Sequence, residues 1–165
     1  MTGNVNQSPQ SMLQIVCNTS DSFSTLVVGS QWISKEIIAT FLQHVAASFG
    51  IYFDRNVNDD VLFPHMWISC PIVYETSVGS TVDTFPGSNL SLTQVNVAYI
   101  PVLQDSFLWC FFVVNFVTST IDYHDIYGFH PVVGLIEIIE TWSVSIQSER
   151  TGRQTKFRWF FARSP

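Results

Sequence analysis

The side chains best suited to chemistry in this 165-residue chain are three cysteines and one segment rich in aspartate and histidine. Cys17, Cys70 and Cys110 form no CxxC pair and lie in apolar surroundings. An odd number of unpaired cysteines favours reduced thiols over a disulfide framework or a zinc site. Cys110 follows a tryptophan within an apolar stretch, so we expect a buried, inert thiol with a raised pKa. Cys70 lies beside a proline and has no visible base.

The densest cluster of ligand-type side chains lies at one strand end and consists of Asp122, His124, Asp125 and His130. Asp122 and His124 are two residues apart, so they share one face of a strand. The other two follow close to a turn. This pattern is more typical of solvated polar residues than of a metal site, and no metal or cofactor is predicted. The acidic segment at 51–60 lacks the spacing and the turn glycine of an EF-hand, so we expect a solvated loop there.

Two helices are predicted to position these residues. Over 34–50, Ser34 is a suitable N-cap, apolar side chains recur at helical spacing, and Gly50 is a suitable C-cap. A second helix is predicted where Pro131 marks a start. The apolar residues over 132–142 cover most sides of that helix, which predicts that it is buried or lies at an interface.

Strands alternate with loops in the rest of the chain. They are predicted at 95–102, ended by Pro101, at 108–117, at 120–124 and at 155–162, and the segment 61–74 is predicted to hold short strands or a turn of helix. The strand at 108–117 is apolar on both faces, which is typical of the centre of a sheet. We therefore predict an α+β fold with a mixed, mainly antiparallel sheet flanked by helices.

Composition indicates one domain in which part of the apolar surface stays exposed to solvent. Hydrophobic residues make up 47% of the chain, including 14 phenylalanines, and charged residues only 12%, against about 25% in typical domains. So little charge leaves apolar patches exposed, which predicts a homo-oligomer or a stable protein partner. Residues 1–10 are predicted to be a disordered leader, and residues 11–165 a single domain.

Charge is distributed unevenly along the chain. All 13 acidic residues lie within 1–149, where only Lys35 and Arg55 oppose them, so this part carries −11. Residues 150–165 contain five basic residues and no acidic one, which gives +5. Such a tail either folds back on its own acidic domain or reaches the acidic face of a partner. The acidic body would repel phosphate, so nucleic acid is not an expected partner.

No targeting or membrane segment is apparent. The N-terminus is polar and lacks the apolar core of a signal peptide. The longest apolar stretch, at 107–114, is far shorter than the roughly 20 residues of a membrane helix. We therefore expect a soluble protein of the cytoplasm or nucleus.

Four short motifs occur in an order that matches one known family. They are QWISKEII at 31–38, YIPV at 99–102, Leu108-Trp109 before an apolar strand, and IDYHD at 121–125. These motifs resemble those of the SUMO-specific (Ulp1-like) cysteine proteases, including the copies carried by plant transposons. The resemblance covers residues 26–147 and implies a truncated form of that fold, in which Gln147 takes the place of the oxyanion glutamine.

The resemblance also implies that catalysis is lost. The family uses a cysteine nucleophile, a histidine base and an orienting aspartate. Asp125 matches the aspartate, but Leu108 stands in place of the histidine, and leucine cannot accept a proton. No D-C-G motif follows Gln147, because residues 148–165 contain no cysteine. Asp125 and Gln147 are thus remnants, and we predict no enzyme activity.

Binding residues are predicted in two places. Trp32 and Trp109 match the tryptophans that, in the family, close a tunnel over the diglycine tail of a ubiquitin-like substrate. Ordinary core packing is the alternative, and Lys35 favours it because it replaces an acidic residue of the family motif. The second predicted surface is an apolar one formed by Leu135, Ile139, Trp142, Phe157, Trp159 and Phe161. The divergent tail at 150–165 either fills core space or adds an edge strand to a second copy or another protein.

The leading functional prediction is a non-catalytic protein-interaction module, or pseudo-protease. It would bind, sequester or redirect a protein partner and would also self-associate. One alternative is a residual or altered thiol hydrolase acting on ubiquitin-like conjugates. Another is a protein that binds a ubiquitin-like partner without cleaving it.

Overall fold

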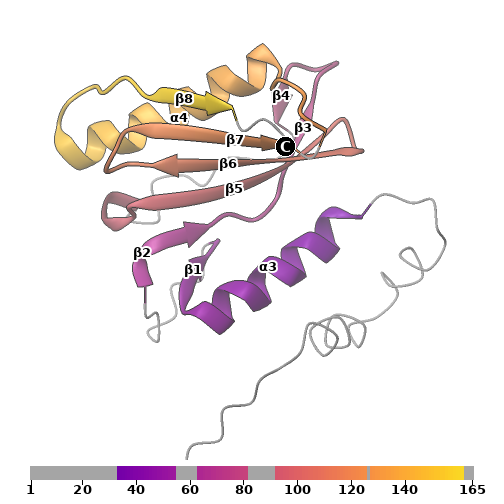
Figure 1. The fold of residues 1–165 in the computed structure, drawn as a ribbon, viewed down its shortest axis with the longest axis horizontal. Coiled ribbons are helices and arrows are strands. Elements are labelled where there is room, and N and C mark those ends of the chain that lie inside the picture. The colour runs from indigo at the N-terminus through magenta and orange to yellow at the C-terminus, as the bar shows by residue number, and fades with distance from the viewer. Residues whose placement is uncertain (1–32, 55–62, 82–91, 126, 162–165) are drawn as a thin grey trace, which may run out of the picture. The chain divides into compact units, whose positions relative to one another are not determined.

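The computed structural model describes residues 33–54, 63–81, 92–125 and 127–161. They form two α-helices, a 3₁₀ turn (η2, Leu92–Gln94) and eight strands (Figure 1). The helices are α3 (Lys35–Phe49) and α4 (Val133–Thr151). The strands are β1 (Ile51–Phe53), β2 (Phe63–Ile68), β3 (Ile72–Glu75), β4 (Ser80–Thr81), β5 (Val97–Gln104), β6 (Leu108–Asn115), β7 (Thr120–Asp125) and β8 (Arg158–Phe161). The chain divides into two compact units, Met1–Phe41 and Leu42–Pro165.

The strands form one mixed sheet in the order β1-β2-β5-β6-β7-β8, with β3 also pairing with β5 and β4. The longest pairings, β5 with β6 and β6 with β7, are antiparallel. The pairings of β1 with β2, of β5 with β2 and β3, and of β7 with β8 are parallel and shorter. The α+β class and the mixed, mostly antiparallel sheet are therefore confirmed. The predicted central strand is confirmed as well, because β6 lies between β5 and β7.

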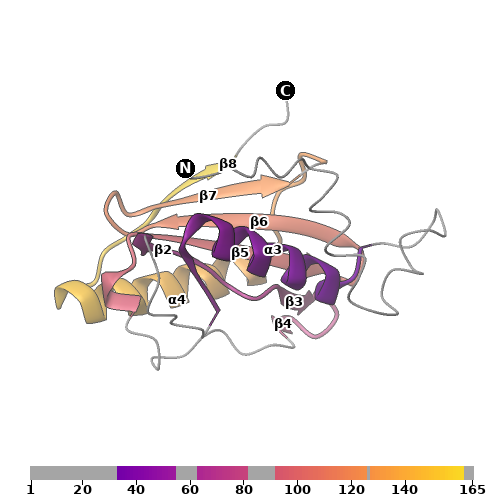
Figure 2. The ribbon, with the colours of Figure 1, turned by 90° about the horizontal axis from the view of Figure 1, so that it is seen from below.

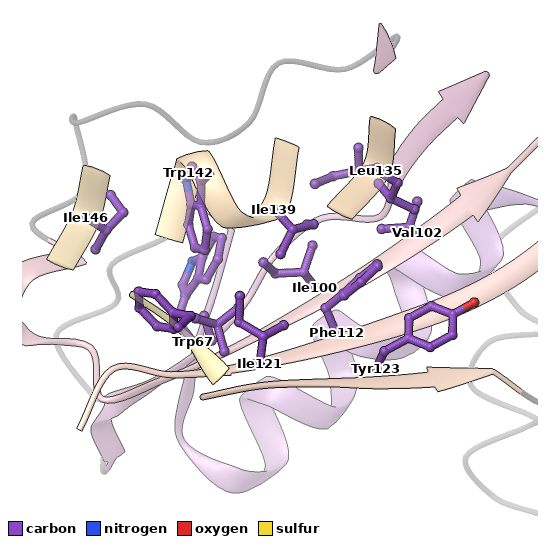
Figure 3. Packing of buried hydrophobic residues seen from close by; sticks show 14 of the residues in the cluster. Trp67, Ile100, Val102, Phe112, Ile121, Tyr123, Leu135, Ile139, Trp142 and Ile146 are labelled. Carbon is purple, nitrogen blue, oxygen red and sulfur yellow. The ribbon is translucent and has the colours of Figure 1, made fainter. Parts of the chain in front are cut away.

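One face of this sheet is buried under α4 (Figures 1 and 2). Alternate residues of the inner strands point to this face, among them Ile100 and Phe112, which are fully buried. Leu135 and Ile139 of α4 are also fully buried and pack against them (Figure 3). Burying each such side chain stabilises the fold by about 1.5–3 kcal/mol, so this layer is the main core.

The aromatic end of the core is built around Trp142 of α4. Its ring stacks on Trp67 at a centroid distance of 5.9 Å and lies 6.0 Å from Phe116. Phe157 meets Phe116 edge to face, and its side chain is 2% exposed. These contacts hold the chain between α4 and β8 against the sheet, which explains why β8 lies beside β7.

The predicted first helix is confirmed as α3. The backbone N–H of Ile37 donates to Oγ of Ser34, which is the predicted N-cap, and Gly50 has the positive φ of 62° that suits a C-cap. In the C-terminal half of this helix, Ala46 packs with Ile68 in a second, smaller cluster. Neither α3 nor α4, the helices of the described part of the chain, is long and apolar enough to cross a membrane.

Pro101 was predicted to end a strand, but it lies inside β5 opposite Phe111. The reason is the register of the neighbouring strands. β2 pairs with β5 over Val97–Tyr99 and β3 pairs over Val102–Gln104. Pro101 falls between these two pairings, where no neighbour needs the N–H that proline lacks.

Two other segments differ from the prediction or refine it. Ile51–Phe53, expected in a loop, forms β1 and pairs with β2. The tail strand predicted at 155–162 is confirmed in its centre as β8. The predicted leader at 1–10 and the acidic residues Asp59 and Asp60 lie outside the described residues.

The start of α4 offers a test of this packing. A Cβ at Gly134 would lie 2.5 Å from the hydroxyl oxygen of the buried Tyr74. Alanine normally stabilises a helix by about 1 kcal/mol relative to glycine. We nevertheless expect Gly134→Ala to lower the free energy of unfolding by about 1 kcal/mol or more, because the overlap forces the ring to shift.

The matched control is the same substitution in a Tyr74→Phe background. The next ring atom lies 3.6 Å from the new Cβ, so Gly134→Ala should there be neutral or stabilising. Urea denaturation of the four proteins measures this coupling. Equal effects of Gly134→Ala in both backgrounds would contradict the packing.

Candidate functional site

The structure brings three polar side chains together at one end of the sheet. Cys110 of β6 lies directly opposite Asp125 of β7, and Phe112 lies opposite Tyr123. Cys110, Tyr123 and Asp125 all point to the face that α4 covers, and all three are buried. A thiol, a phenol and a carboxylate thus share one buried corner (Tyr123 is drawn in Figure 3).

Asp125 has a clear structural role in this corner. Its carboxylate accepts the backbone N–H of Tyr127 at 3.0 Å and that of Phe129 at 2.7 Å. Hydrogen bonds from backbone N–H groups to a carboxylate are charge-assisted and stronger than neutral ones. They fix the turn that leads from β7 towards α4. The aspartate that the resemblance links to catalysis therefore holds the backbone of a loop.

Leu108, which the resemblance matches to the missing base, lies close to this corner. Leu108 begins β6 and is buried on the same face as Cys110. Burial raises the pKa of the Cys110 thiol to about 12, and the negative charge of Asp125 adds to the shift. Burial also raises the pKa of Tyr123, and nearby Cys110 and Asp125 contribute. The expected burial and raised pKa of the Cys110 thiol are thus confirmed, and a thiol with so high a pKa keeps its proton near neutral pH.

Gln147 does not lie in this corner. Its side-chain amide donates to the carbonyl of Phe116 at 3.0 Å, at the opposite end of β6 from Cys110. Six residues of strand separate the two positions, which is about 20 Å at 3.3 Å per residue. Gln147 and Asp125 therefore do not lie together in this structure, and their origin as remnants of one catalytic centre stays a prediction.

The predicted tryptophan pair is described only in part. Trp109 lies opposite Leu103 and is half-buried, with its side chain on the sheet face opposite to the one that carries Asp125. Trp32 lies outside the described residues. Whether the two tryptophans enclose a tunnel stays a prediction.

Four of the residues predicted to form an apolar binding surface are core residues instead. Leu135 and Ile139 are 0% exposed, Phe157 is 2% exposed and Trp142 is 9% exposed. The reason is that the apolar side of α4 meets the sheet, whereas Val133, on another side of the helix, is 70% exposed. These four side chains stabilise the fold and offer no surface to a partner.

The other two predicted binding residues, Trp159 and Phe161, lie on β8. Trp159 is half-buried and stacks on Phe161 at 6.1 Å, while Phe161 is 42% exposed and meets the ring of His130 at 5.6 Å. Phe160, which points to the opposite face, is 49% exposed. In the described part of the sheet, β8 pairs only with β7, so it is an edge strand (Figure 1). An exposed aromatic edge is therefore the main surface feature of this end of the chain.

Sequence reasoning missed two kinds of residue at this surface. Phe160 follows the strand alternation, so its exposure was readable once β8 was known to lie at an edge. Tyr127 and Phe129 are also exposed, with ring centroids 5.9 Å apart, and their backbone is held by Asp125. No local sequence signal indicated that this loop would present two rings to solvent.

The possible metal ligands do not converge. Asp122 is half-buried and His124 is exposed on one face of β7, whereas Asp125 is buried on the other. Within the residues that the structure describes, no group of three or more His, Cys, Asp or Glu side chains is arranged to hold a metal ion.

No protein-family model matches this chain, and no curated protein is significantly similar to it. The likeness to SUMO-specific proteases therefore depends on the four short motifs alone.

The raised pKa of Cys110 predicts how stability changes with pH. Below pH 9 the thiol holds its proton in both the folded and the unfolded chain. Between pH 9 and 12 only the unfolded chain loses it, so the free energy of unfolding should fall over this range. We expect Cys110→Ala to make this fall less steep in urea titrations at successive pH values.

The matched control is the interval from pH 6 to 8, where the wild type and Cys110→Ala should run parallel, since the Cys110 thiol keeps its proton there in both states. Parallel curves from pH 9 upward as well would show that the Cys110 thiol does not titrate differently in the folded state.

Proposed function

We propose that this chain is a non-catalytic protein-interaction module that binds, sequesters or redirects a protein partner in the cytoplasm or nucleus. The observation that carries the proposal is the edge strand β8, where Phe160 and Phe161 are exposed beside a backbone edge that no described strand covers. An exposed sheet edge with aromatic side chains is a template for another extended chain.

The polar corner supports a role without catalysis. A thiol protease needs a thiolate and a base that accepts its proton. Leu108 supplies no base, and the buried Cys110 keeps its proton. The carboxylate of Asp125 binds the backbone of the loop at 127–129. In this reading the chain is a pseudo-protease, as the motif resemblance implies.

The alternative is a thiol hydrolase acting on ubiquitin-like conjugates. It would need a reactive cysteine other than Cys110. Cys70 is half-buried at the end of β2, and Cys17 lies outside the described residues. The predicted self-association and the predicted binding of a ubiquitin-like protein through Trp32 and Trp109 remain further forms of the interaction hypothesis.

A covalent probe separates the two functions. We expect no adduct when the chain is incubated with SUMO vinyl sulfone or ubiquitin vinyl sulfone, because Leu108 supplies no base and the buried Cys110 keeps its proton. Intact-protein mass spectrometry would detect the adduct, and an active SUMO protease serves as the positive control. An adduct on Cys17, Cys70 or Cys110 that forms in the folded chain, and not after denaturation, would overturn the proposal.

A further inference from the structure

The edge strand β8 is approached through a cationic segment. Arg153, Lys156 and Arg158 are all exposed, and no described carboxylate forms an ion pair with any of them. Arg150, by contrast, is used within the fold, where it donates to the carbonyl of Val95 and to Oδ1 of Asn96. The sequence left two roles open for the basic tail, which are folding back on its own acidic domain and reaching the acidic face of a partner. Three cations of the tail do not pair with described acidic residues, which favours the second role.

The far end of β8 is aromatic and well supported. Phe161 is held between the ring of Trp159 and the edges of Tyr123 and His130, at centroid distances of 5.6–6.4 Å. Phe160 projects from the opposite face. Rings that are already fixed lose little conformational freedom on binding, so they are suited to contact a partner.

Among the residues that the structure describes, the backbone of β8 pairs with β7 on one side and with no strand on the other. The N–H of Arg158 donates to the carbonyl of Ser119 at 3.0 Å, at the start of the pairing with β7. Backbone groups of successive strand residues point to opposite sides, so Phe160 also faces β7. The N–H and C=O groups of Trp159 and Phe161 therefore point away from β7, towards the open edge.

We propose that this edge binds an extended segment of a partner protein by strand addition, with apolar residues against the aromatic end and acidic residues against Arg153, Lys156 and Arg158. The inference rests on the proposed function and names the chemistry of the partner. An antiparallel strand makes the stronger ladder. Its first residues would pair with Phe161 and Trp159, and its acidic residues would follow.

The charge of the tail favours an acidic partner segment over a second copy of the chain. Residues 150–165 hold five basic residues and no acidic one. Pairing two β8 edges would bring two cationic segments along one seam, and like charges across a strand pair are destabilising. Nucleic acid would meet the cations, but it has no peptide backbone that could pair with the edge of β8.

The test uses the full chain and a fluorescein-labelled peptide of alternating valine and threonine followed by a run of glutamates. Fluorescence anisotropy at low salt should show saturable binding. The double substitution Arg153→Glu with Arg158→Glu should weaken it roughly tenfold, and added salt should weaken it as well. Phe160→Ser should weaken it by a similar factor.

Two matched controls accompany the variants. Val78→Ser changes a side chain that is 72% exposed in the turn between β3 and β4, away from β8, and should leave binding unchanged. The same peptide with lysines in place of the glutamates should not bind. The partner class is wrong if the lysine peptide binds equally well, or if an RNA oligonucleotide competes for the site.

Failure of this inference is distinguishable from failure of the proposed function. Absence of peptide binding, or binding that ignores the Arg158 and Phe160 variants, overturns the inference alone. Light scattering that shows a dimer, separated by Phe160→Ser, together with no peptide binding, would make a second copy the occupant. A vinyl-sulfone adduct overturns the proposed function whatever the peptide does.

Discussion

The burial of one sheet face under α4 is the interaction on which the rest of the structure depends. The fully buried Leu135 and Ile139 cover the inner strands, and Trp142 stacks on Trp67 at the end of this layer. Because α4 runs back across the sheet before β8 begins, β8 joins β7 in parallel. The edge position of β8, and hence its exposed rings, follows from this crossing.

The same crossing explains why a catalytic-looking residue has a structural role. The chain must leave β7 and turn towards α4 within a few residues, and the carboxylate of Asp125 holds that turn by accepting two backbone N–H groups. Its neighbour Cys110 is protonated because burial opposes a second negative charge beside it. Gln147 lies at the other end of β6, where it satisfies the carbonyl of Phe116. Residues that motifs relate to one site thus stabilise separate parts of the fold.

Local sequence patterns were sufficient to predict the helices and strands, but they were insufficient to predict which of their side chains and backbone groups are covered by a neighbour. The cap at Ser34, the apolar run of β6 and the alternation in β8 each predicted an element correctly, since they depend on neighbours in the chain. Pro101 was misread because only the register of β2 and β3 shows that its missing N–H has no partner to lose. Leu135 and its apolar neighbours on α4 were predicted to form a binding surface, but they are buried against the sheet. The apolar side of a helix does not reveal from sequence whether a sheet or a partner covers it.

Strand addition at β8 requires a backbone edge that is free, as it is among the described strands, and hydrogen exchange measures this directly. By residue-resolved NMR of the free chain, the amides of Arg158 and Phe160, which face β7, should exchange slowly. The amides of Trp159 and Phe161 should exchange roughly tenfold faster or more, because no described strand pairs with them. Equal, strong protection of all four amides would show that the edge is already covered and would contradict the proposed mode of binding.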